Sequence, residues 1–331
     1  MKKIKLFFVG FWKDFKPERL RIYMDLSKYY QIEVCENAED AEYIICSCFA
    51  PYYEYCKYPQ VRIMFCGEPY IPDFNFVDYA ICEYPIKLFD RCFYYPGCID
   101  YKKHFMKLTS EKKQYGKEFV QSKQFFANFI NSHESENNIR GDFFKELSKY
   151  KRVESAGTYL NNMEDNWHVS FADESKTDFQ KKCKFSLCFE STKHQGFVTE
   201  KITDAFYAET IPVYFGSEQV FEFFNKDAFI YCRDRDDFDR VIRKIIELDS
   251  DEDKYLDMIN QPILNPKFNV EKHFSDYEVF LKHIFEQPAE KAFRRIRNYH
   301  SQAHEKYLTS INLQRSRKDS LVERIKRLIE R

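Results

Sequence analysis

The chain has 331 residues, of which 44% are hydrophobic and 32% charged, and its formal net charge is −1. This length suits two domains of ordinary size, and the hydrophobic content excludes global disorder. No apolar run reaches the 18 residues of a membrane-spanning helix. Aromatic residues reach 18%, which fits a saccharide-binding surface, although ordinary core filling accounts for it equally simply.

The eleven cysteines are an odd number, so one chain cannot pair them all. Near the start, Lys5 interrupts the apolar stretch, which therefore predicts a strand and not a secretory signal. We expect a reduced, cytoplasmic setting in which most cysteines are buried free thiols. A zinc site among Cys46, Cys48, Cys56 and Cys66 is disfavoured, because no C-x2-C pair occurs and no histidine lies between them.

The first part of the chain alternates short apolar runs with helical patterns. The expected strands are 5–10, 32–35, 43–48, 61–66 and 77–82, with a helix over 18–30 that begins near Pro17. Strands that alternate with helices indicate a mainly parallel sheet covered on both faces. The polar stretch 102–123 is expected to be a linker.

A second alternating series starts near residue 124. Its expected strands are 125–130, 152–155, 183–189, 211–215 and 228–231, and its expected helices are 140–150, 199–209, 218–224 and 237–248. Two successive open sheets predict an α/β protein with two Rossmann-like domains that face a cleft. We place these domains at residues 1–120 and 121–287.

Only eight glycines occur, and neither G-x-G-x-x-G nor G-x-x-x-x-G-K-[ST] is present. A dinucleotide dehydrogenase and a P-loop enzyme are therefore disfavoured. If the chain binds phosphate, a helix N-terminus and fixed cations must supply the contacts.

The segment 184–206 carries the clearest chemistry. Its apolar strand ends at Phe189, so Glu190 emerges at the carboxyl end, where open α/β sheets bind ligands. Thr199 is suited to cap the next helix, which places Glu200 and Lys201 in the first turn. A bound diphosphate would interact favourably with the helix N-terminus and the lysine, and Glu200 would accept hydrogen bonds from two ribose hydroxyls. An ordinary helix start with a solvated Glu-Lys pair explains the same residues equally well.

The motif Cys-Phe-Glu, then Phe-Val-Thr-Glu-Lys-Ile, then Ile-Pro-Val-Tyr-Phe-Gly runs over residues 188–216. It resembles the donor-site motif of glycosyltransferase family 10, the α-1,3/1,4-fucosyltransferases, in their bacterial form. Phe-Cys-Gly-Glu-Pro at 65–69, Phe-Asn-Phe-Val-Asp-Tyr-Ala at 74–80 and the segment 125–140 are also similar to the family. The resemblance spans about 61–256. It implies the B-type glycosyltransferase fold, with the acceptor in the N-terminal domain, GDP-fucose in the C-terminal domain and an inverting single displacement.

The resemblance also implies roles for single residues. Glu68 matches the general base, Lys201 and Arg140 match cations that bind the diphosphate, and Glu200 matches the ribose ligand. The remaining donor-binding residues implied are Asn128, Glu190, Ser191 and Phe197. Two alternatives stay open: Glu68 as a surface carboxylate without a catalytic part, and Glu190 as a structural carboxylate.

Two positions depart from the family pattern. Ser191 stands where the family has asparagine, and Phe197 stands where it has tyrosine. Both positions lie near the donor sugar in the family, so fucose specificity is less secure than nucleotide binding. A different nucleotide-sugar donor on the same fold is therefore an alternative.

The C-terminal segment 288–331 differs in composition, with 12 Lys/Arg against 5 Asp/Glu, a net charge of +7. Apolar residues from Leu321 to Ile329 fall on one helical face, which predicts a basic amphipathic helical tail. Such a tail can lie on an anionic membrane, pack on the body or pair with a second chain in a homodimer. We expect its removal to spare catalysis, and we expect no nucleic-acid partner.

The resemblance implies an inverting α-1,3-fucosyltransferase, and we expect it to move L-fucose from GDP-fucose to the 3-hydroxyl of GlcNAc in an N-acetyllactosamine-like acceptor. Its setting would be surface-glycan synthesis, such as Lewis-antigen decoration of lipopolysaccharide, at the inner membrane face. No metal or other cofactor is expected, because no D-x-D pair lies in the donor motif, although a divalent cation can stimulate release of GDP. A non-catalytic glycan-binding or membrane-associated protein is the alternative from another class.

Overall fold

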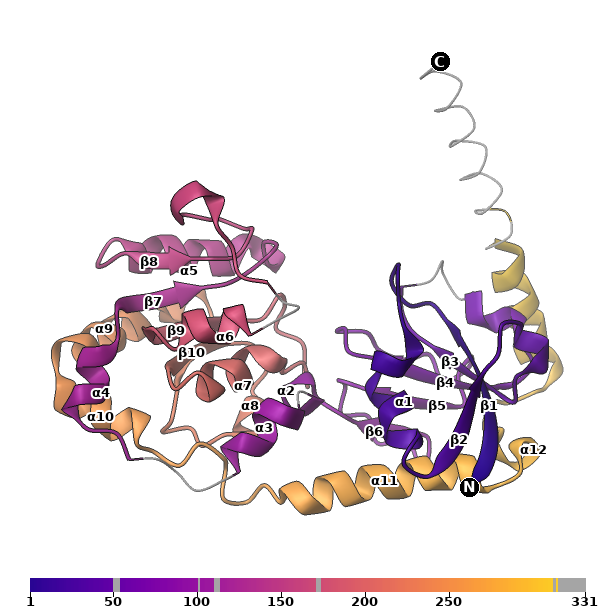
Figure 1. Ribbon diagram of the computed structural model, residues 1–331. Helices are drawn as coiled ribbons and strands as arrows, with labels where there is room; N and C mark the ends of the chain where they lie inside the picture. Colours follow the sequence, from indigo (N-terminus) through magenta and orange to yellow (C-terminus); the bar gives the residue numbers. More distant parts are fainter. Residues whose placement is uncertain (50–53, 101, 110–113, 171–173, 312–313, 315–331) are drawn as a thin grey trace. The chain divides into compact units, whose positions relative to one another are not determined.

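The computed structural model describes residues 1–49, 54–100, 102–109, 114–170, 174–311 and 314 (Figure 1). Contacts divide the chain into two compact units, one made of residues 1–94 with residues from 271 onward and the other of residues 95–270. Each unit contains one parallel sheet with helices packed on it. The predicted α/β fold with two Rossmann-like units is confirmed.

All strand pairs of the first unit's sheet are parallel. Its strands are β1 (Lys2–Val9), β2 (Tyr30–Val34), β3 (Tyr43–Cys46), β4 (Val61–Cys66), β5 (Tyr79–Cys82) and β6 (Cys92–Tyr94). Their order is β2-β1-β3-β4-β5-β6. The chain therefore changes direction across the sheet between β1 and β3, which is the topological switch point where such sheets bind ligands.

The predicted helix over 18–30 is shorter in the structure. A 3-10 turn covers Pro17–Arg19, and α1 covers Arg21–Leu26. Leu20 between them is extended, with φ −77° and ψ 138°. Tyr30 already belongs to β2 and contacts Phe285 at a ring separation of 6.0 Å, so packing ends the helix before its sequence pattern ends. Two further 3-10 turns cover Ala38–Asp40 and Glu54–Lys57. The three-residue β6 was not predicted.

The second unit's sheet repeats this order. Its parallel strands are β7 (Phe125–Phe129), β8 (Val153–Ser155), β9 (Cys183–Phe189), β10 (Ile211–Phe215) and β11 (Ile230–Cys232), arranged β11-β10-β9-β7-β8. Counted along the chain, the first strand again lies between the second and the third. The switch point of this sheet is therefore between β7 and β9.

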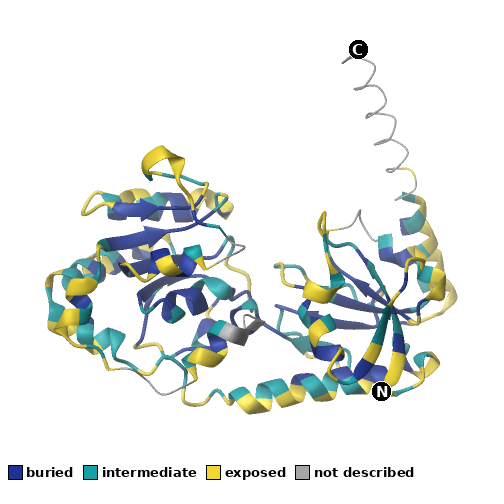
Figure 2. Cartoon of the chain, in the orientation of Figure 1, coloured by how far each residue is buried: buried dark blue, intermediate teal, exposed yellow. Residues whose placement is uncertain are grey.

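Helices cover both faces of the second sheet. One face packs against α5 (Ile139–Ser148), α9 (Phe238–Ser250) and α10 (Glu252–Ile259), and this core is buried in Figure 2. On β9, Phe189 meets Phe143 of α5, whereas the next side chain, Cys188, donates to the carbonyl of Lys201 in α7 (Glu200–Tyr207). Since neighbouring side chains of a strand point to opposite faces, α7 covers the other face.

The remaining helical elements are α2 (Gly97–Asp100), α3 (Lys102–Leu108), α4 (Lys117–Ser122), α6 (Ser175–Gln180), α8 (Val220–Phe223) and 3-10 turns at Glu136–Asn138, Glu164–Asn166 and Arg235–Asp237.

The contact-based units differ from the predicted domain boundaries of 1–120 and 121–287. Residues 95–120 belong to the second unit, because Thr203 of α7 donates to the carbonyl of Cys98 at 2.6 Å and Phe105 is fully buried near Phe224. The expected linker over 102–123 therefore contains α3 and α4. Most residues of this segment are polar, so its composition did not reveal the few apolar side chains that pack against the second unit.

The chain returns to the first unit at α11 (Val270–Glu286), followed by α12 (Ala289–Ala292). Tyr277, Leu281, Ile284 and Phe285 of α11 are buried, and the Phe285 ring lies 4.8 Å from that of Tyr43. The expected assignment of residues 271–287 to the donor domain is therefore corrected by the structure.

The segment 288–331 also begins as part of the first unit. Arg295 is buried and lies 3.0 Å from Asp78, and Arg62 pairs with Glu305 at 2.9 Å. Leu308, in the helical stretch 299–311, joins the core cluster of this unit. The predicted separate tail is thus wrong for these residues. The apolar stripe from Leu321 to Ile329 lies outside the described residues.

Candidate active site

The carboxyl end of β9 places Glu190 at the start of α7, next to the switch point of the second sheet. Glu190 is fully buried. One carboxylate oxygen accepts from the backbone N–H of Thr199 at 2.8 Å, and the other lies 2.9 Å from the ammonium of Lys201. Thr199 occupies the N-cap position, but its hydroxyl binds Glu190 and not a helix N–H. The predicted capping bond of the Thr199 side chain is thus not formed, and the Glu190 carboxylate instead holds the N-cap residue and places negative charge at the helix N-terminus.

Lys201 is held in place before any ligand binds. Burial alone would lower the pKa of Lys201, but the carboxylates of Glu190 and Glu200 outweigh burial, and the pKa is raised above its usual value. Its ammonium also donates to the Thr199 hydroxyl at 2.9 Å. About a quarter of the side chain (23%) stays exposed, so the charge can meet an anion at the helix N-terminus.

Glu200 has a further neighbour that sequence reasoning missed. Burial opposes ionisation of Glu200, but Lys201 and Lys176 overcome it and hold the pKa of its carboxyl below the usual value. Lys176, on α6, pairs with Asp204 at 2.7 Å, and Asp204 also lies 2.8 Å from the ring of His104. These residues lie on α6, α7 and α3, which come together only in the folded protein. No local sequence pattern therefore identifies Lys176 as a neighbour of Glu200.

Arg140 lies in the first turn of α5 and is 5% exposed. Its guanidinium donates to the carbonyls of His133 and Phe189, each at 2.9 Å, which ties the start of α5 to the end of β9. Burial lowers the pKa of Arg140, although Glu190 and Glu134 partly offset this effect. The structure thus places Arg140 at the predicted edge of the sheet. Among the described residues, its Nε has no hydrogen-bond partner.

The loop between β9 and α7 carries the two positions that depart from the family pattern. Ser191 is half-buried, and its carbonyl accepts from the N–H of Glu136 at 2.9 Å. Phe197 is only 4% exposed, so its ring belongs to the packing of the loop. Gly216 lies against Glu190: an added Cβ would come within 2.7 Å of the Glu190 Cγ. The glycine that ends the Ile-Pro-Val-Tyr-Phe-Gly motif is therefore needed for this close approach.

Asn128 lies within the sheet and not at its ligand-binding edge. It is 1% exposed, and its amide donates to the Phe185 carbonyl and to the Ser186 hydroxyl at 3.1 and 2.8 Å. In the register, Asn128 is opposite Ser186 of β9. Ser186 is four residues before Glu190, so Asn128 lies about 13 Å from Glu190 along the strand direction. The implied donor-binding role of Asn128 is not supported, because its amide serves the sheet.

Glu68 lies in the first unit, two residues after β4. It is exposed, its backbone carbonyl accepts from the N–H of Tyr70 at 2.6 Å, and Gly67 precedes it in the turn. This is the carboxyl edge of the sheet, where ligands of such folds bind. An exposed carboxylate in a turn after a central strand has the access that a general base needs.

Two family models match the chain, and the ranges they match contain these motifs. The N-terminal domain of α-(1,3)-fucosyltransferase FucT matches residues 6–101, and the C-terminal part of glycosyltransferase family 10 (fucosyltransferase) matches residues 120–277. Together they cover well over half of the chain. The chain belongs to glycosyltransferase family 10.

Individual family 10 proteins are similar over most of this chain. The α-(1,3)-fucosyltransferase FucT of Helicobacter pylori is 28% identical over 296 residues, which are 79% of this chain and 60% of that protein. The chain thus spans less than two thirds of the length of this curated relative. A crystal structure of α1,3-fucosyltransferase superimposes with a TM-score of 0.70 at 25% identity, covering 85% of this chain and 90% of that one. The structure of α1,3-fucosyltransferase with GDP-fucose gives a TM-score of 0.67 at the same identity, covering 85% and 91%.

A cavity of about 250 Å³ opens at the edge of the second unit, beside the β9–α7 loop. It is lined by Glu136, Asn137, Ile139, Thr192, Lys193, Phe215 and Arg235. Asn137 and Asn138 adopt left-handed backbone conformations, with φ of 58° and 57°, which asparagine tolerates better than most residues. These two residues shape the turn that enters α5 at this cavity.

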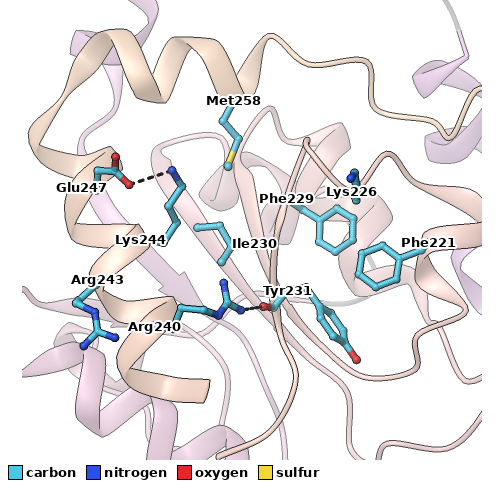
Figure 3. Close-up of a pocket in the computed structure, with 10 residues that line it drawn as sticks. All are labelled: Phe221, Lys226, Phe229, Ile230, Tyr231, Arg240, Arg243, Lys244, Glu247 and Met258. Atoms are coloured by element: carbon cyan, nitrogen blue, oxygen red, sulfur yellow. Dashed lines mark hydrogen bonds and ion pairs between the residues drawn. The ribbon is translucent and has the colours of Figure 1, made fainter. Parts of the chain in front are cut away.

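A second cavity, of about 550 Å³, lies beside the edge strand β11 (Figure 3). Arg240 and Lys244 of α9 form one wall, and Phe221, Phe229 and Tyr231 form the other. Arg240 donates to the Tyr231 carbonyl at 2.6 Å and so covers a backbone acceptor of the edge strand. None of the predicted donor residues lines this cavity, whereas the charged ones among them meet at the carboxyl edge of the sheet.

The eleven cysteines are all free thiols, nine of them buried. Within the described ranges, no group of three or more His, Cys, Asp or Glu side chains is placed to hold a metal ion. The described helices are also all too short or too polar to cross a bilayer.

Proposed function

We propose that this family 10 chain is an inverting α-1,3-fucosyltransferase. It transfers L-fucose from GDP-fucose to the 3-hydroxyl of GlcNAc in an N-acetyllactosamine-like glycan. The observation that carries the proposal is the preformed helix start of α7, where Glu190, Thr199 and Lys201 are locked together beside Glu200. The names of the similar proteins support the same donor and linkage.

On the donor side, Lys201 and the N-terminus of α7 bind the diphosphate. Both favour the negative charge that grows on the diphosphate as the bond to fucose breaks. The ionised Glu200 accepts hydrogen bonds from the ribose hydroxyls, and its lowered pKa keeps it ionised at neutral pH. Arg140 fixes the loop carbonyls around this edge and adds positive charge from beneath.

On the acceptor side, Glu68 takes the proton of the GlcNAc 3-hydroxyl as its oxygen attacks the anomeric carbon of fucose. The new bond forms between that oxygen and the anomeric carbon. The bond to the diphosphate breaks, and its electron pair leaves with GDP. Attack opposite to the leaving group inverts the anomeric centre, and the proton ends on Glu68.

A donor panel tests this function. The full chain is incubated with N-acetyllactosamine and with GDP-fucose, GDP-mannose or UDP-sugars in turn, and product is measured by mass spectrometry. We expect turnover of GDP-fucose and competitive inhibition by GDP. Use of another donor in place of GDP-fucose would overturn the donor assignment and favour the alternative raised by Ser191 and the buried Phe197.

We further propose that transfer needs no metal ion, because Lys201 and the helix N-terminus supply the charge on the leaving group. Activity should therefore persist in EDTA. Strict dependence on added Mn²⁺ or Mg²⁺ would contradict this point, whereas mild stimulation through faster GDP release would agree with it.

For location, we propose a cytoplasmic protein whose basic segment after residue 311 binds an anionic membrane surface. Each Lys or Arg near such a surface contributes about 1 kcal/mol. Flotation with liposomes that contain anionic lipid, comparing the full chain with a chain ending at residue 311, tests the proposal. Equal flotation of both forms would refute it, and a change of mass in light scattering would indicate pairing of chains instead.

A further inference from the structure

The switch point of the first sheet carries a cluster of aromatic rings. Gly10 follows β1, and the loop after it contains Phe11, Trp12 and Phe15. The loop after β3 adds Phe49, whose N–H donates to the Gly10 carbonyl at 2.9 Å. The two loops that flank the switch point are thereby joined by a backbone hydrogen bond, and their rings are brought together.

The rings hold one another in fixed orientations. Phe11 and Phe15 stack with centroids 4.1 Å apart and an interplanar angle of 12°. Trp12 meets Phe15 at 5.2 Å and 82°, and Phe49 at 5.8 Å and 85°. The Trp12 ring is thus supported from two sides by near-perpendicular contacts, which are favourable for aromatic pairs.

This cluster is nevertheless open to solvent. Trp12 is 52% exposed and Phe49 is 49% exposed. Keeping large rings in water forgoes the stabilisation that their burial would give, and clustered exposed apolar side chains mark binding surfaces. The backbone supports the exposed loop in an uncommon conformation, since Asp14 has φ 61° and Gly10 has φ 80°.

The cluster shares an edge of the sheet with Glu68. The rings follow β1 and β3, and Glu68 follows β4, the next strand in the sheet. With neighbouring strands spaced by about 4.8 Å, β1 and β4 are about 10 Å apart at this edge. A saccharide with one sugar at Glu68 can therefore place an adjoining sugar over the rings.

We infer that Trp12, supported by Phe15 and Phe49, is the platform on which a sugar ring of the acceptor glycan stacks. The C–H face of a pyranose is apolar, and a flat, exposed indole offers it a large apolar surface. The inference rests on the proposed function, because it assigns the acceptor to the edge that carries Glu68. Trp12 binds the acceptor and takes no part in proton transfer.

The chain offers its own reporter for this binding. It contains only two tryptophans, Trp12 and Trp167. Trp167 lies in the second unit and is 46% exposed, so it is a matched control for an exposed indole. The variant Trp167→Phe leaves Trp12 as the single indole, and its fluorescence then reports on the platform without any turnover.

The experiment titrates full-length Trp167→Phe protein with N-acetyllactosamine and follows indole emission. It also measures transfer kinetics for Trp12→Ala, Trp12→Phe and Trp167→Ala. We expect a saturable change in emission. We expect Trp12→Ala to raise KM for N-acetyllactosamine about tenfold while KM for GDP-fucose changes less than about twofold. Trp12→Phe should recover much of the loss, and Trp167→Ala should match the wild type.

The possible outcomes separate the two proposals. An active wild type whose Trp12 emission ignores the saccharide, or whose acceptor KM is unchanged in Trp12→Ala, overturns the platform and leaves the proposed function standing. Saturable binding without turnover of any nucleotide sugar supports the platform and overturns the transferase. Unchanged acceptor KM with a lowered melting temperature in Trp12→Ala would show that the rings only pack, and this would also overturn the platform.

Discussion

The two sheets of this protein have the same strand order, yet their switch points carry opposite kinds of side chain. In the second unit, Glu190 and Lys201 are joined by an ion pair of 2.9 Å beneath a helix N-terminus. In the first unit, the corresponding edge presents exposed rings such as Trp12 and the exposed carboxylate of Glu68. One fold thus supports a charged, pre-assembled site and an open, aromatic one.

The difference follows from what each edge must bind under the proposed function. A nucleoside diphosphate has fixed negative charge, so cations held in place by buried partners avoid reorganisation when it binds and leaves. A neutral glycan has few charges and several apolar faces, so rings and one accessible base suit it. The predictions below test whether the two edges have these separate tasks.

The largest effect is expected from Glu68→Gln. The amide is nearly isosteric but cannot take the proton, so turnover should fall by about 10²–10⁴. GDP affinity should stay within about threefold, because the donor residues lie in the other unit. Calorimetry with GDP and initial-rate kinetics measure the two quantities.

A matched control for this variant is Glu36→Gln, an exposed carboxylate that follows the edge strand β2. This variant should leave both turnover and GDP affinity unchanged. Near-normal turnover in Glu68→Gln would remove Glu68 from the mechanism and leave the first unit without a chemical role.

Truncation after residue 287 should lower the stability of the first unit. Ending the chain at residue 287 removes Arg295 and leaves the buried Asp78 without this partner, which costs about 3–5 kcal/mol. Ending it at residue 311 keeps the pair and Leu308. We expect the first truncation to unfold at a much lower temperature and the second to melt like the full chain.

Differential scanning calorimetry of the two truncated chains checks this expectation. Equal melting temperatures would mean that residues 288–311 are dispensable for the first unit, as their composition alone suggests.

Lys201→Ala should weaken GDP binding by about tenfold or more and lower turnover further, since the charge acts on the diphosphate before and during departure. It also leaves Glu190 buried without its cation, so stability should fall as well. The double variant Glu190→Gln, Lys201→Ala should regain stability without regaining GDP affinity.

Lys182→Ala, an exposed lysine before the opposite end of β9, is the charge-matched control. If the double variant recovered GDP binding, Lys201 would act only by neutralising Glu190, and the charged edge would need another diphosphate ligand.

The smallest effect concerns acid stability of the first unit. Burial lowers the pKa of His273 from its usual 6.5 to about 4. Between these values the unfolded chain binds a proton that the folded chain does not, so stability falls as the pH drops from about 6.5 towards 4. His273→Phe should remove this contribution and lose fewer degrees of melting temperature between pH 7.5 and pH 5.

The comparison variant is His168→Phe, which replaces an exposed histidine of the second unit. It should show the same acid sensitivity as the wild type. An identical pH dependence for all three proteins would argue against the lowered pKa of His273.

The sequence predicted the elements that carry continuous apolar runs, such as β4 and β9, because burial on both faces leaves a local signature. Prediction from the sequence failed for elements that are held in place by only a few long-range contacts. The docking of α3 through Phe105 and the ion pair of Arg295 with Asp78 depend on partners about 120 and more than 200 residues away.

The site shows the same division. Glu190 and Lys201 lie in one motif and were found from it, and the structure joins them directly. Lys176 was missed because only the packing of α6 on α7 brings it near Glu200. Asn128 was predicted to bind the donor because it lies in a matching motif, whereas in the structure its amide is buried and hydrogen-bonded within the sheet. Local patterns reveal residue types, and tertiary contacts decide their roles.

The structure of the product tests the proposed transfer most directly. GDP-β-L-fucose and N-acetyllactosamine are incubated with the full chain, and the trisaccharide is analysed by NMR. We expect an α-L-fucosyl residue on the 3-hydroxyl of GlcNAc, with the anomeric configuration inverted and GDP released in equal amount. A β-linked fucose, or no fucosylated product while another nucleotide sugar is consumed, would contradict it.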